Sequence, residues 1–204
     1  MPTVELFYDY SSPWTYLAFT RIEEVARRTT ATIDWRPILV GGIFNTVNPS
    51  VYESRERPVP AKARYLAKDL QDWTEFYGLK ILFPPSVFPV NSVKSLRGAL
   101  VALEHGKICA YSEAVFSAYW SDDLDISKDE VLEPLVRKVG LDPAEYFEKI
   151  QQAAYKDRIR ANTEECMRRG GFGSPTLFVG DSMFFGNDRL VLVEHALAKQ
   201  GGKR

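Results

Sequence analysis

The sequence predicts an α/β fold in which a small sheet domain is interrupted by an inserted all-helical domain. Three observations point to it. β-prone segments occur near the two ends of the chain, at 3–8, 31–37 and 175–185. Helical periodicity fills the region between these ends, and a short helical pattern separates the first two predicted strands. The 204 residues are enough for one large domain or one small fold with an insertion.

The first predicted unit is strand, helix, strand. Thr3–Tyr8 is a short β-prone run, and Ser12-Pro13 then marks a helix start. Serine caps helices well, and proline at the first helical position gives up no useful N–H. Apolar residues at helical spacing follow over 14–26, and 31–37 alternates as a second strand. Because a helix crosses between two strands this close in sequence, we expect the strands to be parallel.

The middle of the chain predicts one long loop and then about six helices. Residues 41–60 contain two adjacent glycines, three prolines and few periodic residues, so we expect a loop of the kind that often has a function. Ser127 and Glu130 predict a capping box, and Asp142-Pro143 predicts another helix start. The predicted helices cover 63–77, 93–105, 110–120 and 127–139, a segment that opens at 142, and 156–169.

The C-terminal segment returns to strands and ends in a helix. Residues 175–179 and 182–185 flank a hairpin-turn candidate, and Asp188 could cap a final helix over 190–197. The order β-α-β, helices, β-β-α is typical of a thioredoxin-like fold with a helical insertion. We expect a thioredoxin-like domain at 1–45 plus 170–204, and an inserted loop and helical domain at 46–169.

Composition favours a globular protein that acts on a small molecule. The 26 Lys and Arg residues balance 27 Asp and Glu, which leaves no basic field for nucleic acid or an anionic membrane. No apolar run approaches a membrane span, and the N-terminal residues show no signal-peptide pattern. Cys109 and Cys166 have neither disulfide-framework nor metal-site spacing. We expect a cytoplasmic protein without a metal site.

Ser12 is the first candidate for chemistry. It lies between a predicted strand end and a helix N-terminus, where free N–H groups and the helix dipole favour an anion. A thioredoxin-type oxidoreductase has Cys-x-x-Cys at this place, whereas this chain has Ser12-Pro13-Trp14-Thr15. Any thiolate here must therefore arrive with a ligand. The competing interpretation is that Ser12 only caps the helix.

Two other segments are candidates for ligand contacts. A cis peptide bond between Ser174 and Pro175 would expose the Ser174 backbone to a ligand, and an ordinary trans bond is the alternative. Asp188 could receive an ammonium group or simply cap a helix. Arg55 and Arg57, in the long predicted loop, could fold over the site or belong to an ordinary surface.

These signals converge on a family resemblance that covers nearly the whole chain. The segments FYDYSSPWTYLA (7–18), RPILVGGIFN (36–45), VPAKARYLAKDL (59–70) and GFGSPTLFVGDSMFFGNDRL (171–190) resemble bacterial 2-hydroxychromene-2-carboxylate isomerases. That family is related to kappa-class glutathione transferases and, more distantly, to the DsbA oxidoreductases. The resemblance implies a homodimer that uses glutathione as its cofactor and a small aromatic carboxylate as its substrate.

The resemblance also implies roles for individual residues. Ser12 resembles the catalytic serine that hydrogen-bonds the glutathione sulfur. Ser174, with Pro175, resembles the residue before a cis-proline whose main chain pairs with the cysteinyl part of glutathione. Lys62 matches a lysine that reaches a glutathione carboxylate, and Asn48 corresponds to a loop asparagine. The segment that resembles the one holding the γ-glutamyl end comprises Phe185, Gly186, Asn187 and Asp188.

One departure concerns the substrate. After G-G-I-F many relatives carry a lysine that meets the substrate, where this chain has Asn45; Arg55 and Arg57 would then meet the substrate carboxylate. The implied reaction is reversible addition of glutathione thiolate to the ring-opened enone, bond rotation, and elimination to trans-o-hydroxybenzylidenepyruvate. A kappa-like glutathione transferase and a non-catalytic glutathione-binding module are alternatives. A disulfide oxidoreductase is disfavoured because position 12 is not cysteine.

Overall fold

Four strands form one mixed sheet in the order β2-β1-β3-β4 in the computed structural model, which describes residues 1–202. Leu6 on β1 lies opposite Trp35 on β2 and Leu177 on β3. The β1–β2 pair is parallel, as predicted, and the β3–β4 hairpin turns at the predicted place. The strands are β1 (Thr3–Tyr8), β2 (Thr32–Pro37), β3 (Thr176–Val179) and β4 (Ser182–Phe185).

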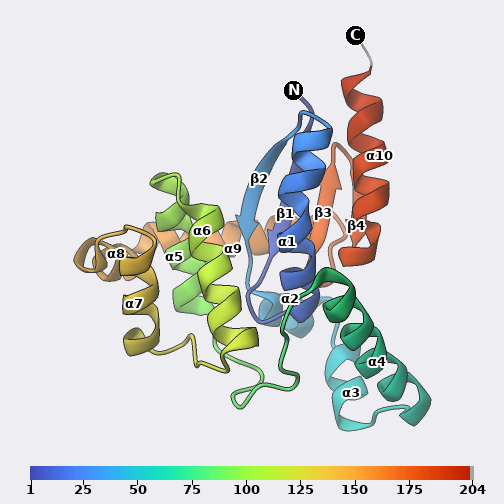
Figure 1. The fold of residues 1–204 in the computed structure, drawn as a ribbon, viewed down its shortest axis with the longest axis horizontal. Coiled ribbons are helices and arrows are strands. Elements are labelled where there is room, and N and C mark those ends of the chain that lie inside the picture. The colour runs from blue at the N-terminus through green and yellow to red at the C-terminus, as the bar shows by residue number, and fades with distance from the viewer. Residues whose placement is uncertain (203–204) are drawn as a thin grey trace.

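Helices cover both faces of this sheet. α1 (Pro13–Arg28) and α10 (Leu190–Gly201) pack against one another and lie in front of the sheet in Figure 1. α9 (Ala153–Arg168) passes behind the sheet and contacts β1 and β2. The N-terminal β-α-β unit and the C-terminal β-β-α unit thus share one sheet. The predicted thioredoxin-like fold with a helical insertion is confirmed.

The insertion between β2 and β3 consists mainly of helices, and its longest non-helical segment, 78–92, joins α4 to α5. α5 joins it to the sheet, because it packs against both β2 and α9. α4 ends at Gly78, whose φ of 66° is a left-handed conformation that glycine adopts without strain. The helices before α9 are α2 (Val40–Thr46), α3 (Ser50–Glu56), α4 (Pro60–Tyr77), α5 (Val93–Glu104), α6 (Ile108–Phe116), a π-helical turn (Ser117–Ser121), α7 (Asp129–Lys138) and α8 (Pro143–Lys149).

The long loop predicted at 41–60 is wrong, because α2 and α3 occupy most of it. Tertiary contacts supply the helix start that the local sequence lacks. The Leu39 N–H donates to Thr163 Oγ1 at 3.0 Å, and the Val40 N–H donates to Asp9 Oδ2 at 2.9 Å. These two donors would otherwise be unsatisfied at the N-terminus of α2.

The two predicted helix caps in the insertion have different outcomes. Asp142 is confirmed, since its carboxylate accepts two backbone N–H bonds from the first turn of α8. The capping box at Ser127 is wrong: α7 begins at Asp129 with Lys128 as its N-cap. Ser127 instead donates its hydroxyl to Asp125 Oδ1 at 2.6 Å, which uses the side chain in the preceding turn.

One cluster of buried apolar side chains extends from the sheet into the insertion. Within it, the Tyr111 and Tyr146 hydroxyls hydrogen-bond at 2.7 Å directly against Gly98 of α5. A Cβ atom at position 98 would lie 2.1 Å from the Tyr146 hydroxyl, so only glycine fits there. Because the core is continuous, the division into 1–45 plus 170–204 and 46–169 stays a prediction. Over residues 1–202 no helix combines the length and apolar character needed to cross a membrane.

Candidate functional site

Ser12 and Ser174 meet where β1 ends. Ser12 is the N-cap of α1 and accepts a bond from the Thr15 N–H at 3.3 Å. The Ser12 hydroxyl also donates to the carbonyl oxygen of Ser174 at 2.8 Å. Ser12 is partly exposed, whereas Ser174 is buried. Ser12 is therefore a helix cap, as one interpretation held, and it is also an accessible donor at the positive end of a helix.

The side chain of Ser174 is fixed from two directions. Its Oγ accepts the Asp9 N–H at 2.9 Å and hydrogen-bonds Thr15 Oγ1 at 2.7 Å. The bond to Pro175 is cis, which is the alternative that the family resemblance implied. Among residues 1–202, no group accepts a hydrogen bond from the Ser174 N–H. A main-chain donor is thus left for a ligand beside the Ser12 hydroxyl.

The segment after β4 lies against Pro175, next to Ser174. The Gly186 N–H donates to the Pro175 carbonyl oxygen at 3.2 Å. Asn187 is only 3% exposed, and its Nδ2 has no hydrogen-bond partner in the described part of the chain. A buried amide donor without a partner is costly unless a ligand satisfies it.

Asp188 does not cap the last helix, and that prediction is wrong. It lies in a 3-10 turn (Asn187–Arg189) that precedes α10. Its carboxylate is exposed and pairs with the Arg189 guanidinium. α10 begins at Leu190 with Arg189 as its N-cap, so Asp188 lies one residue before the capping position.

Asn48 and Phe185 border the site through Phe172. The rings of Phe172 and Phe185 lie 4.4 Å apart, and Asn48 donates its amide to the Phe172 carbonyl oxygen at 3.0 Å. An added Cβ at Gly173 would lie 2.8 Å from the Phe185 ring. The segment 171–174 is therefore closely packed between these two predicted contact residues.

Asn45 and Arg55 belong to an aromatic cluster on α2 and α3. The Arg55 guanidinium lies 5.8 Å from the centre of the Phe44 ring and 5.3 Å from that of Phe88. Asn45 Oδ1 accepts the Tyr52 hydroxyl at 2.8 Å. An arginine held over aromatic rings keeps its charge available for a carboxylate.

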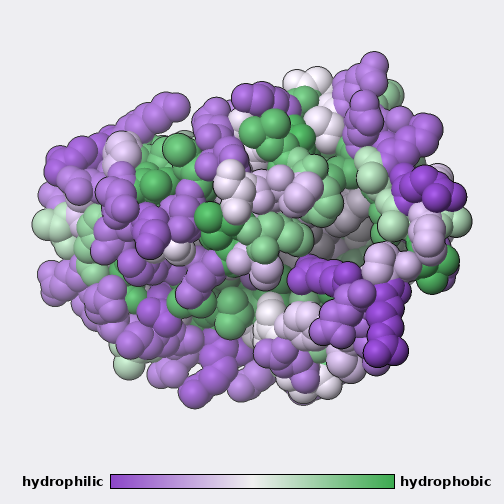
Figure 2. Space-filling view, turned by 90° about the horizontal axis from the view of Figure 1, so that it is seen from below, coloured by the Kyte–Doolittle hydropathy of each residue, from purple (hydrophilic) through white to green (hydrophobic). Residues whose placement is uncertain are grey.

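Arg57 and Lys62 are not brought into this cluster. Both are exposed, and Lys62 lies in the first turn of α4. That end of α4 points away from the sheet in Figure 1. The structure thus gathers Ser12, Ser174 and the 185–188 segment, and leaves Lys62 at the far end of a helix. Figure 2 views the molecule from the end that carries α3 and α4, where the surface is hollowed.

Asp9 is the site residue that the sequence analysis missed. It is 1% exposed and accepts the Ser11 N–H at 2.9 Å, the Ser92 hydroxyl at 2.7 Å and the Val40 N–H at 2.9 Å. Burial raises the pKa of the Asp9 carboxyl, and these hydrogen bonds oppose the rise. A lone acidic residue within the otherwise uncharged run at 6–14 is the signal that could have found it.

Neither cysteine can supply a thiolate. Burial is the main cause that raises the pKa of the Cys166 thiol to about 11 and that of the Cys109 thiol to about 12. Within residues 1–202, no group of three His, Cys, Asp or Glu side chains could hold a metal ion. The chemistry open to this site is stabilisation of an incoming anion by a hydroxyl, main-chain donors and a helix N-terminus.

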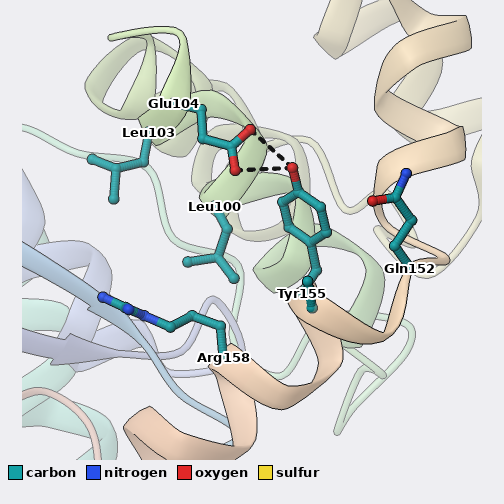
Figure 3. A pocket seen from close by; sticks show the side chains of 7 residues that line it. Leu100, Leu103, Glu104, Gln152, Tyr155 and Arg158 are labelled. Atoms are coloured by element: carbon teal, nitrogen blue, oxygen red, sulfur yellow. Dashed lines mark hydrogen bonds between the residues drawn. The ribbon is translucent and has the colours of Figure 1, made fainter.

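A separate cavity of about 370 Å³ lies between the end of α5 and the start of α9 (Figure 3). Leu100 and Leu103 form its apolar side, and Tyr155 donates its hydroxyl to both carboxylate oxygens of Glu104 at 2.9 and 2.8 Å. Ser92, which contacts Asp9, precedes the opposite end of α5. The cavity is therefore not part of the Ser12 site.

Comparisons with known proteins agree with this fold. A family described as DSBA-like thioredoxin domain matches residues 3–198. The chain is 29% identical over 199 residues to 2-hydroxychromene-2-carboxylate isomerase of Pseudomonas putida, covering 96% of this chain and 94% of that one. It is 28% identical to human glutathione S-transferase kappa 1, covering 97% and 92%. A solved structure of 2-hydroxychromene-2-carboxylate isomerase matches with a TM-score of 0.82 at 29% identity, covering 97% and 95%.

Proposed function

The chain belongs to the family of DsbA-like thioredoxin domains, and from this premise we propose that it is a glutathione-dependent isomerase of 2-hydroxychromene-2-carboxylate or a similar aromatic carboxylate. Near-full-length similarity to isomerases of that name supports isomerase activity. Similarity to a kappa-class glutathione transferase supports glutathione as the cofactor.

One observation carries the proposal: the Ser12 hydroxyl lies at the N-terminus of α1, beside the unpaired main-chain N–H of Ser174, in a chain without an activated thiol. Such a place favours a thiolate, and this thiolate must come from a ligand. Bound glutathione would supply the thiolate that adds reversibly to the conjugated substrate. The Ser12 hydroxyl would stabilise the thiolate by donating a hydrogen bond to its sulfur, and the dipole of α1 would stabilise the same negative charge.

The residues around Ser12 fit the rest of glutathione. The Ser174 N–H is free to pair with a peptide carbonyl of the ligand. The unpartnered Nδ2 of Asn187 is a donor suited to the charged γ-glutamyl end. We propose that Phe185, Gly186, Asn187 and Asp188 line that end and that Asn48 contributes from the opposite side. The role of Lys62 stays a prediction.

The substrate carboxylate would meet the α2–α3 cluster. Arg55 is held over Phe44 and Phe88, so its cation lies beside rings that can pack on an aromatic substrate. Asn45 can donate its amide, because only its oxygen is used by Tyr52. These two residues are our proposed substrate contacts, and Arg57 stays a prediction.

The decisive experiment follows the ultraviolet absorbance of 2-hydroxychromene-2-carboxylate with purified protein, with and without glutathione. We expect fast isomerisation only with glutathione, at an undiminished glutathione concentration. Consumption of glutathione would favour the kappa-like transferase. Saturable glutathione binding without turnover of any electrophile would favour a non-catalytic binding module.

We also propose a homodimer. α4 has 18 residues, of which only Leu70 is buried, and it exposes Tyr65, Leu66 and Phe76. Phe76 also lines a groove of about 480 Å³ between α1, α4 and α10. Exposed apolar side chains in such number suit a protein interface. Sedimentation should give twice the chain mass, and a mass of one chain would contradict the dimer.

The cytoplasm is the proposed location. Cys109 and Cys166 are unpaired thiols, which suits a reducing compartment. Fractionation of cells that produce the protein, with a periplasmic marker as control, tests this location.

A further inference from the structure

The carboxyl group of Asp9 lies at a junction of three elements. It is buried at the end of β1 and accepts three hydrogen bonds of 2.7 to 2.9 Å. The donors come from three separate stretches of chain: the turn that presents Ser12, the first residue of α2, and the residue that precedes α5. Among the side-chain hydrogen bonds of residues 1–202, only those of the Asp9 carboxyl join these three stretches.

The contacts divide between the two carboxyl oxygens. Oδ1 accepts from the Ser11 N–H and the Ser92 hydroxyl, and Oδ2 accepts from the Val40 N–H. The backbone N–H of Asp9 donates to Ser174 Oγ. Asp9 thus joins the Ser12–Ser174 pair on one side to α2 and α5 on the other.

The residues proposed to contact the substrate lie on α2 and α3 and in the segment before α5. α2 leads through Phe44 and Asn45 to α3, whose Arg55 lies over the Phe44 ring. Phe88, the second ring beside Arg55, lies four residues before Ser92. The position of this cluster relative to Ser12 is therefore set where Val40 and Ser92 meet Asp9.

We propose that Asp9 is a positioning residue, which holds the substrate-contacting helices α2 and α3 at a fixed place relative to Ser12. The inference rests on the proposed function, because it concerns the same reaction. The Asp9 carbonyl oxygen accepts the Ser12 N–H at 3.2 Å. The Asp9 carboxyl, which the substitution changes, hydrogen-bonds neither Ser12 nor Arg55. It acts through the backbone of Ser11 and Val40 and through the hydroxyl of Ser92.

The substitution Asp9→Asn affects the three hydrogen bonds from Ser11, Val40 and Ser92 differently. Asparagine has one acceptor oxygen, and with that oxygen facing Ser11 and Ser92 it keeps two bonds. Its NH₂ group then meets the Val40 N–H, donor against donor. The substitution thus releases α2 and leaves the Ser12 turn in place. We expect the KM for 2-hydroxychromene-2-carboxylate to rise about tenfold, and the pKa of the bound glutathione thiol, followed by thiolate absorbance, to stay at the wild-type value.

Two further variants keep the test decisive. Ser92→Ala removes one donor to Asp9 with a smaller disturbance and should raise the same KM about threefold. Ser95→Ala is the matched control: its hydroxyl donates to the Ser92 carbonyl at 2.9 Å on the same helix and does not contact Asp9. It should leave the KM and the thiol pKa unchanged. Hydrogen exchange at the Val40 amide should be faster in Asp9→Asn than in Ser95→Ala.

The outcomes separate the two proposals. A wild-type protein that does not isomerise the chromene carboxylate overturns the proposed function. An active wild type whose Asp9→Asn and Ser92→Ala variants keep the KM and lose only kcat overturns the positioning role, because a merely structural defect reduces the amount of active protein. Equal KM increases in Ser95→Ala would overturn it as well.

Discussion

The Ser12 hydroxyl and the Ser174 carbonyl oxygen lie 2.8 Å apart, and this hydrogen bond uses the only proton that the hydroxyl can donate. A thiolate that binds Ser12 must therefore take the place of the Ser174 carbonyl as acceptor. The exchange breaks the bond to the Ser174 carbonyl, while the Ser12 oxygen stays held at the N-cap of α1 by the Thr15 N–H.

Ser12→Ala should lower kcat/KM of the glutathione-dependent isomerisation on the order of 30- to 150-fold, since a donor to developing charge contributes about 2–3 kcal/mol. Ser95→Ala removes a hydroxyl that also donates to a backbone carbonyl, at 2.9 Å, and is the control. Steady-state kinetics of the two variants measure the difference. An unchanged kcat/KM for Ser12→Ala would eliminate the proposed role.

Asn187→Ala should weaken glutathione binding about tenfold, because it removes the buried Nδ2 donor that we propose for the charged γ-glutamyl end of the ligand. Titration calorimetry measures the Kd. The same titration of Lys62→Ala tests the distant predicted contact. A wild-type Kd for Asn187→Ala would place the γ-glutamyl end elsewhere.

Gly98→Ala should destabilise the protein by about 1–3 kcal/mol, because the added Cβ would lie 2.1 Å from the Tyr146 hydroxyl and 2.4 Å from that of Tyr111. Urea unfolding measures the change. Gly41→Ala is the control: nothing lies within 4 Å of its Cβ, and alanine favours the helix α2. Equal stability of the two variants would contradict this close packing.

Asp9 should make stability depend on pH. Burial raises the pKa of its carboxyl above 3.8, so the folded chain keeps this proton to higher pH than the unfolded chain does. The contribution of Asp9 to the free energy of unfolding is full below about pH 4 and is lost as the pH rises through the raised pKa. The wild-type free energy minus that of Asp9→Asn should therefore fall with increasing pH. A difference that grows with pH would show a lowered pKa instead.

Both cysteines should resist alkylation in the folded protein. A thiol pKa of about 11 for Cys166 and about 12 for Cys109 leaves ~10⁻³ or less as thiolate at pH 8. Mass spectrometry after iodoacetamide treatment should find both unmodified, and both modified in guanidinium chloride. Rapid native modification with loss of isomerisation would show that the chain has a reactive thiol of its own.

The sequence predicted those parts of the fold that depend on residues close together along the chain. Ser12-Pro13 marks the start of α1, the Gly180-Asp181 turn marks the hairpin, and Gly78 marks the end of α4. Each is a short signal whose meaning depends on its immediate neighbours. The parallel pairing of β1 and β2 followed from the helix between them.

Features that depend on distant residues could not be predicted in the same way. The start of α2 is capped by Asp9 and by Thr163, which lies 124 positions from its partner Leu39. The family resemblance predicts Asn187 as a contact residue. That its Nδ2 is a buried donor without a partner depends on the surrounding chain and could be found only in the structure. The role of Asp9 could not be predicted, because its three hydrogen-bond partners are spread along the chain from Ser11 to Ser92. From the sequence alone it is one polar residue after a predicted strand.

The Ser12–Ser174 pair joins residues 162 positions apart, and this separation has a consequence for biosynthesis. During translation Ser12 leaves the ribosome early, and its helix can form long before Ser174 exists. The complete pair arises only after the whole insertion and the C-terminal strands have emerged and closed this loop. A nascent or truncated chain that ends before β3 therefore lacks the partner of Ser12 that completes the site.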